Sequence, residues 1–155
     1  MENLEQLAKR KKKSFLKVLR KGNRSQMISL LPDLHEQAFS EIDCLECAAC
    51  CKNYSPTFKP TDIKRISKYL GMKEGDFVDE YLLVDEENDY VVNSKPCPFL
   101  AEDNRCKIYE VRPGDCARFP YTDEDVLIDK YGLTLKNSTF CPAVFKVLEE
   151  LEKVI

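Results

Sequence analysis

Eight cysteines, four of them closely spaced, are the residues of this chain best suited to chemistry. Four lie within eight residues in a C-x2-C-x2-C-C run, and four follow downstream: Cys44, Cys47, Cys50 and Cys51, then Cys97, Cys106, Cys116 and Cys141. A two-residue gap lets two thiolates turn inward on one tight turn and bind a single metal centre. Three such ligands in series are hard to explain by packing alone. The sequence therefore predicts a metal or iron–sulfur site with all eight cysteines as candidate ligands.

The spacing of the cysteines is compatible with zinc and with iron–sulfur, and it favours iron–sulfur. Four-cysteine zinc sites generally use two C-x2-C pairs, and only the first half of this pattern has that form. The C-x2-C-x2-C part corresponds to the first three ligands of a bacterial 4Fe–4S loop, whose remote fourth cysteine precedes a proline. Both Cys97-Pro98 and Cys141-Pro142 provide that context. We therefore expect an iron–sulfur cluster, with 4Fe–4S favoured, or zinc as the alternative.

The adjacent pair Cys50 and Cys51 adds a constraint. Neighbouring side chains point apart in most backbone conformations, so both thiolates rarely reach one mononuclear metal. Either the two serve separate centres, or one of them bridges a multinuclear cluster. A vicinal disulfide or a redox switch is the alternative without metal. Two tetrathiolate sites would use all eight cysteines.

A tetrathiolate centre needs compensating charge and hydrogen-bond donors, because such a site carries about two negative charges. Six basic residues lie within a few positions of a cysteine: Lys52, Lys95, Arg105, Lys107, Arg112 and Arg118. The only histidine, His35, is expected to be an ordinary helix residue rather than a ligand or proton shuttle. No nucleophile elbow, phosphate-binding glycine loop or zincin helix is present.

The composition fits a soluble globular protein of one domain. The chain has 155 residues, of which 43% are hydrophobic and 33% charged, enough for a substantial core. No apolar stretch approaches the roughly 18 residues of a membrane span, and the N-terminus has no apolar signal region. We therefore expect a cytoplasmic location, where clustered cysteines serve metals or redox chemistry more often than a disulfide framework.

The charge is unevenly distributed. Residues 1–24 contain nine Lys/Arg and two Glu, a net charge of +7, while the other 131 residues have 15 basic and 25 acidic groups, a net charge of −10. The simplest interpretation is a solvated helix face with leucines and Phe15 docked on the body. The alternative is contact with a protein partner, an anionic membrane surface or nucleic acid through Lys9 to Arg24. Nucleic acid is the less favoured partner, because Phe15, the aromatic residue within this run, is expected to dock on the body and not to stack on bases.

The apolar pattern predicts a mostly helical chain. Helices are expected over residues 3–21, 32–42, 61–70, 75–83 and from Pro142 onward, with a short helical segment within 112–120. Thr61 is the expected N-cap of the third helix, and Gly71 is expected at its C-terminal end. Short β structure is expected at 90–92, in a hairpin over 97–109 that turns at 102–104, and in a pair formed by 126–128 and 133–135.

The predicted fold class is mostly α with a small β element (α+β), in a cysteine-rich, metal-centred single domain. A basic N-terminal helical extension over residues 1–30 is expected to precede a cysteine-cluster domain over residues 31–155.

The order of motifs resembles a known family. These motifs are the run over residues 44–51, Cys97-Pro98-Phe99-Leu100, then Cys106-Lys107-Ile108-Tyr109-Glu110-Val111-Arg112-Pro113, and Cys116-Ala117-Arg118-Phe119-Pro120. Over roughly residues 40–145 the chain is similar to the CxxCxxCC cysteine-cluster family, also called YkgJ-like proteins, described as zinc- or iron-chelating domains. The resemblance implies metal or cluster binding, and for most members no reaction is known. Longer relatives, the flagellin lysine N-methylases, have a similar cysteine domain thought to hold an iron–sulfur cluster.

Three functional hypotheses follow. The first is a metal-binding protein with a structural, electron-transfer or metal-handling role. The second is a small cluster-dependent protein-modifying enzyme related to the lysine N-methylases. The third is an adaptor that binds anionic partners through the basic N-terminal helix. The sequence does not decide whether the protein is an enzyme.

Overall fold

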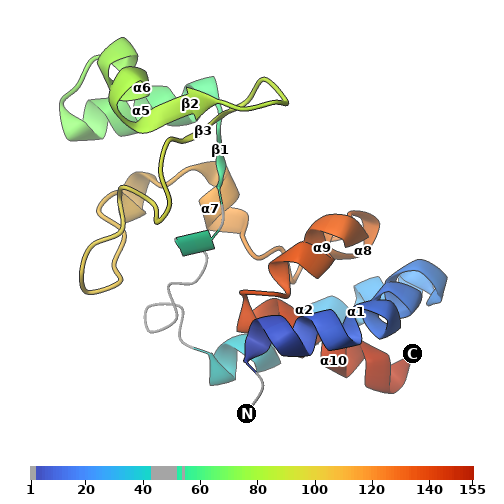
Figure 1. Cartoon of the computed structure of the whole chain (residues 1–155). Helices are drawn as coiled ribbons and strands as arrows, with labels where there is room; N and C mark the ends of the chain where they lie inside the picture. Colours follow the sequence, from blue (N-terminus) through green and yellow to red (C-terminus); the bar gives the residue numbers. More distant parts are fainter. Residues whose placement is uncertain (1–2, 43–51, 54) are drawn as a thin grey trace. The chain divides into compact units, whose positions relative to one another are not determined.

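The computed structural model describes residues 3–42, 52–53 and 55–155. The chain divides into two compact units. Unit 1 consists of Met1–Cys44 and Pro120–Ile155, and unit 2 of Leu45–Phe119. Figure 1 labels their helices and strands. None of the helices within the described ranges is long and apolar enough to cross a membrane.

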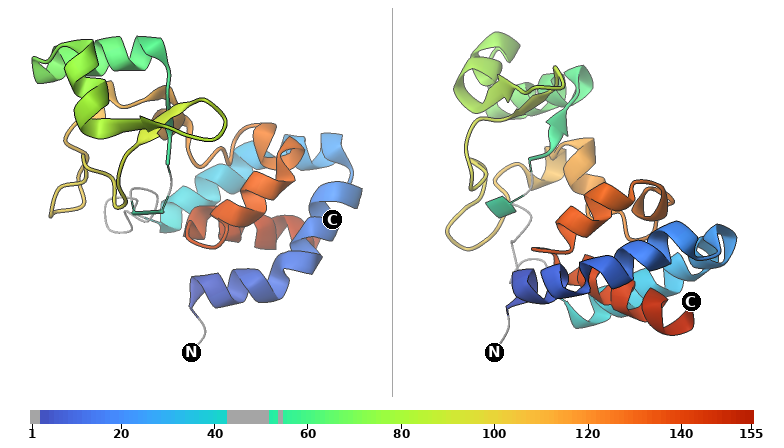
Figure 2. Two further views of the ribbon diagram at one scale, coloured as in Figure 1. Left: turned by 45° about the horizontal axis from the view of Figure 1, so that its top comes forward. Right: turned by 45° about the vertical axis from the view of Figure 1, so that its right-hand side comes forward.

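Unit 1 is a helical assembly. Its elements are α1 (Leu4–Lys21), α2 (Arg24–Glu41), α8 (Val126–Asp129), α9 (Tyr131–Asn137) and α10 (Pro142–Val154). The last helix packs against α1 and α2, and α9 packs against α1, as the right-hand view of Figure 2 shows. Phe15 of α1 meets Phe145 of α10 edge to face, with ring centroids 5.4 Å apart. These two helices therefore share one apolar core.

The basic helix α1 forms where the sequence predicts it. Asn3 is its N-cap, and the Oδ1 atom of Asn3 accepts a hydrogen bond from the Gln6 N–H at 2.9 Å. Ala8, Phe15 and Leu19 are buried on one side. The helix ends at Gly22, where a Cβ atom would lie 2.6 Å from the Val18 carbonyl oxygen. The close backbone approach at this end therefore requires glycine.

The predicted start of the second helix is wrong. The sequence places it at Pro32, but α2 begins eight residues earlier at Arg24 and contains Pro32. Asn23 is the N-cap and accepts a hydrogen bond from the Gln26 N–H at 3.0 Å. Burial of Met27, Leu31 and other apolar residues on one side stabilises the helix through the proline.

The predicted strand pair at 126–128 and 133–135 is also wrong, because both segments are helical and form α8 and α9. A short run of branched apolar residues does not distinguish a strand from a buried helix. Here Leu127, Ile128 and Leu135 are buried in unit 1. The Thr134 hydroxyl of α9 donates a hydrogen bond to the Leu127 carbonyl of α8 at 2.6 Å and so links the two helices.

Unit 2 combines a small antiparallel sheet with helices. Its elements are β1 (Thr57–Phe58), α5 (Pro60–Leu70), α6 (Glu74–Tyr81), β2 (Leu82–Val84), β3 (Tyr90–Val92), the 3-10 helix η1 (Tyr109–Val111) and α7 (Gly114–Arg118). The strand order is β1-β3-β2, with Phe58 opposite Tyr90 and Leu83 opposite Val91. One apolar cluster forms the core: Phe58, Ile63, Ile66, Phe77, Leu82, Val92, Phe99 and Ile108.

Most predicted elements of unit 2 are confirmed, with small corrections at their ends. The third helix begins at Pro60 with Lys59 as N-cap, so Thr61 is not the cap. Gly71 ends it with a φ of 70°, as predicted for a glycine at this position. Residues 82 and 83, predicted as helix, belong to β2. The fold class, mostly α with a small β element, is confirmed, whereas the division at residue 30 stays a prediction.

Candidate metal centre

The predicted cysteine ligands fall in different parts of the chain. Cys44, Cys47, Cys50 and Cys51 lie outside the described residues. Unit 2 contains three of the others, Cys97, Cys106 and Cys116, all half-buried. Cys141 is buried in unit 1.

Cys97 and Cys106 lie on the two arms of one small hairpin, but its β structure is a single bridge, and Tyr109, predicted as β, belongs to η1. The Leu100 N–H donates to the Cys97 carbonyl at 3.0 Å, and Leu100 pairs with Cys106 in an antiparallel bridge. The Lys107 N–H donates to the Phe99 carbonyl at 2.8 Å. The predicted turn is present, with Asn104 at a φ of 67°.

Each arm of this hairpin is anchored by a buried residue two positions after its cysteine. Phe99 follows Cys97 and packs against the rings of Phe77 and Tyr81, with centroids 6.1 and 4.8 Å apart. Ile108 follows Cys106 and is almost fully buried in the same core. Both cysteines pack against this core cluster. The core therefore holds both thiol-bearing segments in place.

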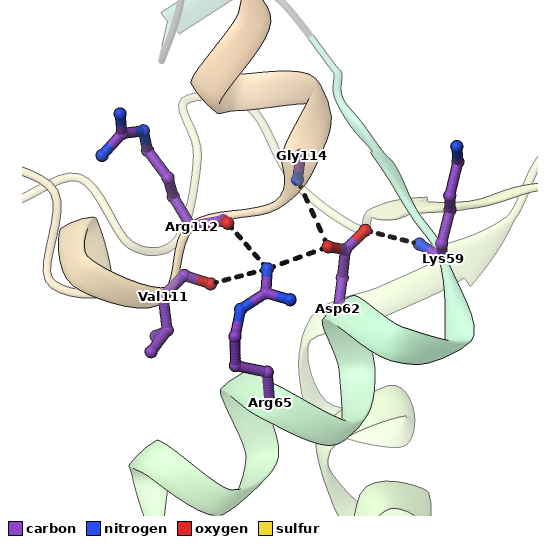
Figure 3. A network of polar contacts seen from close by, with 6 residues as sticks. All are labelled: Lys59, Asp62, Arg65, Val111, Arg112 and Gly114. Atoms are coloured by element: carbon purple, nitrogen blue, oxygen red, sulfur yellow. Dashed lines mark hydrogen bonds and ion pairs between the residues drawn. The ribbon is translucent and has the colours of Figure 1, made fainter.

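Cys116 lies in the five-residue helix α7, and the chain leading into that helix is held by α5 (Figure 3). The Gly114 N–H donates to Asp62 Oδ1 at 3.2 Å. The Arg65 Nη2 atom donates to the carbonyl oxygens of Arg112 at 2.9 Å and Val111 at 3.3 Å. The same nitrogen lies 2.9 Å from Asp62 Oδ1.

A second link joins α7 to the sheet. The Thr57 N–H of β1 donates to Asp115 Oδ2 at 2.9 Å, and Asp115 directly precedes Cys116. The segment that carries Cys116 is thus held from both α5 and β1.

Asp62 is a buried carboxylate with 5% of its surface exposed. Burial raises the pKa of its carboxyl group, but the donors around it outweigh that effect and the net shift is downward. These donors are the Lys59 N–H at 2.9 Å, the Arg65 guanidinium and the Gly114 N–H. Asp62 is therefore ionised in the folded protein at neutral pH.

The sequence did not single out Asp62 or Arg65 as parts of a site. Asp62 is in the first turn of α5, where an acidic residue is ordinary, and Arg65 is one turn later. Their partners lie 46 to 52 residues further along the chain. A local pattern contains no signal of such a pairing.

Cys141 is the N-cap of α10 and directly precedes Pro142. Its N–H donates to the Asn137 carbonyl at 2.9 Å, and its own carbonyl accepts from the Phe145 N–H at 3.2 Å. These two backbone bonds and the burial of Cys141 hold this cysteine at the start of α10.

Arg112 and Arg105, both predicted to compensate charge, have contacts with neighbouring residues. The Arg112 guanidinium stacks 4.2 Å from the Tyr109 ring centroid and donates to the Tyr109 carbonyl at 3.1 Å. Arg105 lies 3.6 Å from an Asp103 oxygen. A role for either residue beside a metal stays a prediction.

His35 lies in α2 of unit 1. Its Nδ1 atom is 2.6 Å from the hydroxyl oxygen of Thr122, a fully buried residue, and its ring lies against Phe39. Within the described ranges, no three or more His, Cys, Asp or Glu side chains are grouped closely enough to hold a metal ion.

The family model of the CxxCxxCC proteins, described as a putative zinc- or iron-chelating domain, matches residues 43–142. The chain belongs to the CxxCxxCC family. The match begins one residue before Cys44 and ends one residue after Cys141, so it contains all eight cysteines. It confirms the resemblance found in the sequence. Neither the curated proteins nor the solved structures yielded a match.

Proposed function

We propose that this CxxCxxCC protein holds an iron–sulfur cluster or zinc through its eight cysteine thiolates, with 4Fe–4S as the favoured centre. The observation behind the proposal is that core packing and hydrogen bonds fix the segments that contain the downstream cysteines. Cys97 and Cys106 lie on a hairpin anchored in one core, and Cys116 follows a segment held by the buried Asp62 carboxylate and the exposed Arg65 guanidinium paired with it. Rigid placement of thiol-bearing segments is typical of metal ligands.

The proposed role depends on the metal. An iron–sulfur cluster would make electron transfer the main role, because its potential is set by hydrogen bonds to sulfur and by exposure. Zinc, which has no redox chemistry, would give a structural or metal-handling role. We place the protein in the cytoplasm, where thiols stay reduced and available as ligands.

Substitution of a single cysteine tests the ligand assignment. Cys106→Ser should reduce the metal content of protein purified without oxygen, because a serine hydroxyl is a poor ligand for zinc and iron at neutral pH. Met72→Ser is the matched control, because Met72 packs against the same core cluster and has no thiol. The control should lose stability and keep its metal. If Cys106→Ser keeps the wild-type metal content, Cys106 is a small core residue and not a ligand.

A second candidate function is binding of an anionic partner through α1. This helix has eight Lys/Arg and one Glu, and its apolar side is buried in unit 1. Lys13, Lys17 and Lys21 are exposed at four-residue intervals, so they lie on one side of the helix. Among the described residues none of the three has an ion-pair partner. With its apolar side buried, α1 would contact a partner through lysine side chains.

A triple lysine variant tests this second function. A short DNA duplex serves as a generic polyanion probe, and replacement of Lys13, Lys17 and Lys21 by glutamine should weaken binding. The slope of log affinity against log salt concentration should become less negative by about 0.9 for each phosphate that the variant no longer neutralises. The matched control replaces the exposed Lys64, Lys68 and Lys73 of unit 2. Equal affinities of the two triple variants would contradict the assignment to α1.

A further inference from the structure

The helix that carries Cys116 is too short to fix its own position. α7 has five residues, and an isolated helix of that length is unstable in water. Its placement therefore depends on contacts with neighbouring elements.

Besides the bond from Thr57 of β1 to Asp115, those contacts come from two residues one turn apart on α5. Arg65 binds the carbonyl oxygens of Val111 and Arg112, and Asp62 binds the N–H of Gly114 (Figure 3). Three of the five residues before Cys116 are thus bonded to one face of α5. We call Asp62 and Arg65, with these backbone contacts, the α5 clamp.

The two side chains of the clamp also hold each other. Arg65 Nη2 lies 2.9 Å from Asp62 Oδ1, and the second oxygen of Asp62 accepts from the Lys59 N–H at 2.9 Å. The carboxylate therefore has three donors, and its orientation is determined by its own helix. The Arg65 side chain is 41% exposed, and an ion pair with an exposed partner contributes little net stability. What this pair provides is a defined position for the segment bonded to it.

We propose that Asp62 and Arg65 are positioning residues that fix Cys116 as a metal ligand. The inference rests on the proposed metal-binding function, and neither residue contacts the metal in this account. Removal of groups that orient a metal ligand without touching the metal typically weakens metal affinity by 10–100-fold. The clamp therefore sets the affinity of the site through the geometry of one thiolate.

The test compares three variants of the purified metal-loaded protein. Asp62→Asn removes the negative charge that holds Arg65. It also replaces one oxygen that accepts hydrogen bonds with an NH2 group that can only donate them. Tyr69→Phe is the matched control, because the Tyr69 hydroxyl donates to Glu110 at 2.8 Å and so links α5 to η1 through a residue outside the segment 111–115. Ile66→Val is the stability control, because Ile66 is fully buried in the same helix. Metal retention is measured against increasing concentrations of a competing chelator, and X-ray absorption of the bound metal counts its sulfur ligands.

Asp62→Asn is expected to lose metal at chelator concentrations about 10–100-fold lower than wild type, with fewer or more distant sulfur ligands. Both controls should retain metal within about 3-fold of wild type, since loss of an exposed hydrogen bond or of one methyl group leaves the ligand segment in place. If Asp62→Asn does not fold, Arg65→Lys takes its place, because it keeps the charge and loses the planar donor group.

Retention and sulfur coordination in the clamp variants equal to those of Ile66→Val would overturn the positioning role. A wild-type protein without metal would be recognised before any variant is made. That result would overturn the metal-binding function itself, and the positioning role with it.

Discussion

At the scale of single residues, Asp62 shows how a charge is held inside unit 2. Burial alone would favour its neutral form, but two backbone N–H groups and a guanidinium stabilise the carboxylate and lower its pKa. The ionised carboxylate of Asp62 is thus more stable in the folded chain than in the unfolded chain. Asp62 therefore links the stability of unit 2 to pH.

The sign of this pH dependence follows from the lowered pKa. The contribution of Asp62 is present above the pKa of an unfolded aspartate, about 3.9, and is lost as the pH falls through the lower pKa of the folded state. At pH 7 Asp62→Asn should lower the free energy of unfolding by about 1–3 kcal/mol. The difference should shrink below pH 4. Urea unfolding of both proteins from pH 7 to pH 2.5 measures it, and a difference independent of pH would contradict the account.

The cysteines of the candidate site can be recognised from the sequence, whereas the polar residues that hold their segments cannot. The cysteine run is recognisable because its ligand spacing is local, and the hairpin with Cys97 and Cys106 follows from turn residues between them. Asp62 is not recognisable, because its hydrogen bond with Gly114 joins residues 52 positions apart. Tertiary contacts of this kind are determined by packing and leave no periodic signal.

At the scale of elements, Gly71 provides a test of how α5 ends. Its φ of 70° is a left-handed conformation, and a Cβ there would meet nothing within 4 Å. Gly71→Ala should therefore cost about 1 kcal/mol from backbone strain alone. Gly75→Ala is the matched control, because Gly75 has the same open surroundings in α6 without a positive φ. Urea unfolding should show destabilisation only for Gly71→Ala, and equal effects of the two substitutions would contradict this explanation.

The predicted elements succeeded where one physical signal dominated. The helices α1 and α10 have amphipathic patterns and clear first turns, and α5 ends at a glycine as expected. The prediction was wrong for α8 and α9, where short apolar runs are ambiguous until their burial is known. It also placed the start of α2 at Pro32, because proline usually marks the first turn of a helix.

At the scale of the whole molecule, the predicted ligands are distributed over both compact units. Cys97, Cys106 and Cys116 belong to unit 2, and Cys141 belongs to unit 1. If these thiolates bind metal, part of the free energy of metal binding is also free energy of folding.

Removal of the metal should therefore destabilise the protein. A ligand at 100 times its dissociation constant stabilises the folded state by about 2.7 kcal/mol. Treatment with a strong chelator should lower the thermal midpoint, and return of the same metal should restore it. The Cys106→Ser variant is the control, because it should respond less to the chelator than the wild type does. A midpoint unaffected by metal removal would contradict the link between binding and folding.

The most direct test of the central claim is the metal and acid-labile sulfide content of the protein purified without oxygen, measured together with its absorption spectrum. We predict iron and sulfide with a broad band near about 400 nm for an iron–sulfur cluster, or about two zinc ions per chain for tetrathiolate sites. A folded protein with neither metal, whose eight cysteines all react with a thiol reagent, would contradict the account.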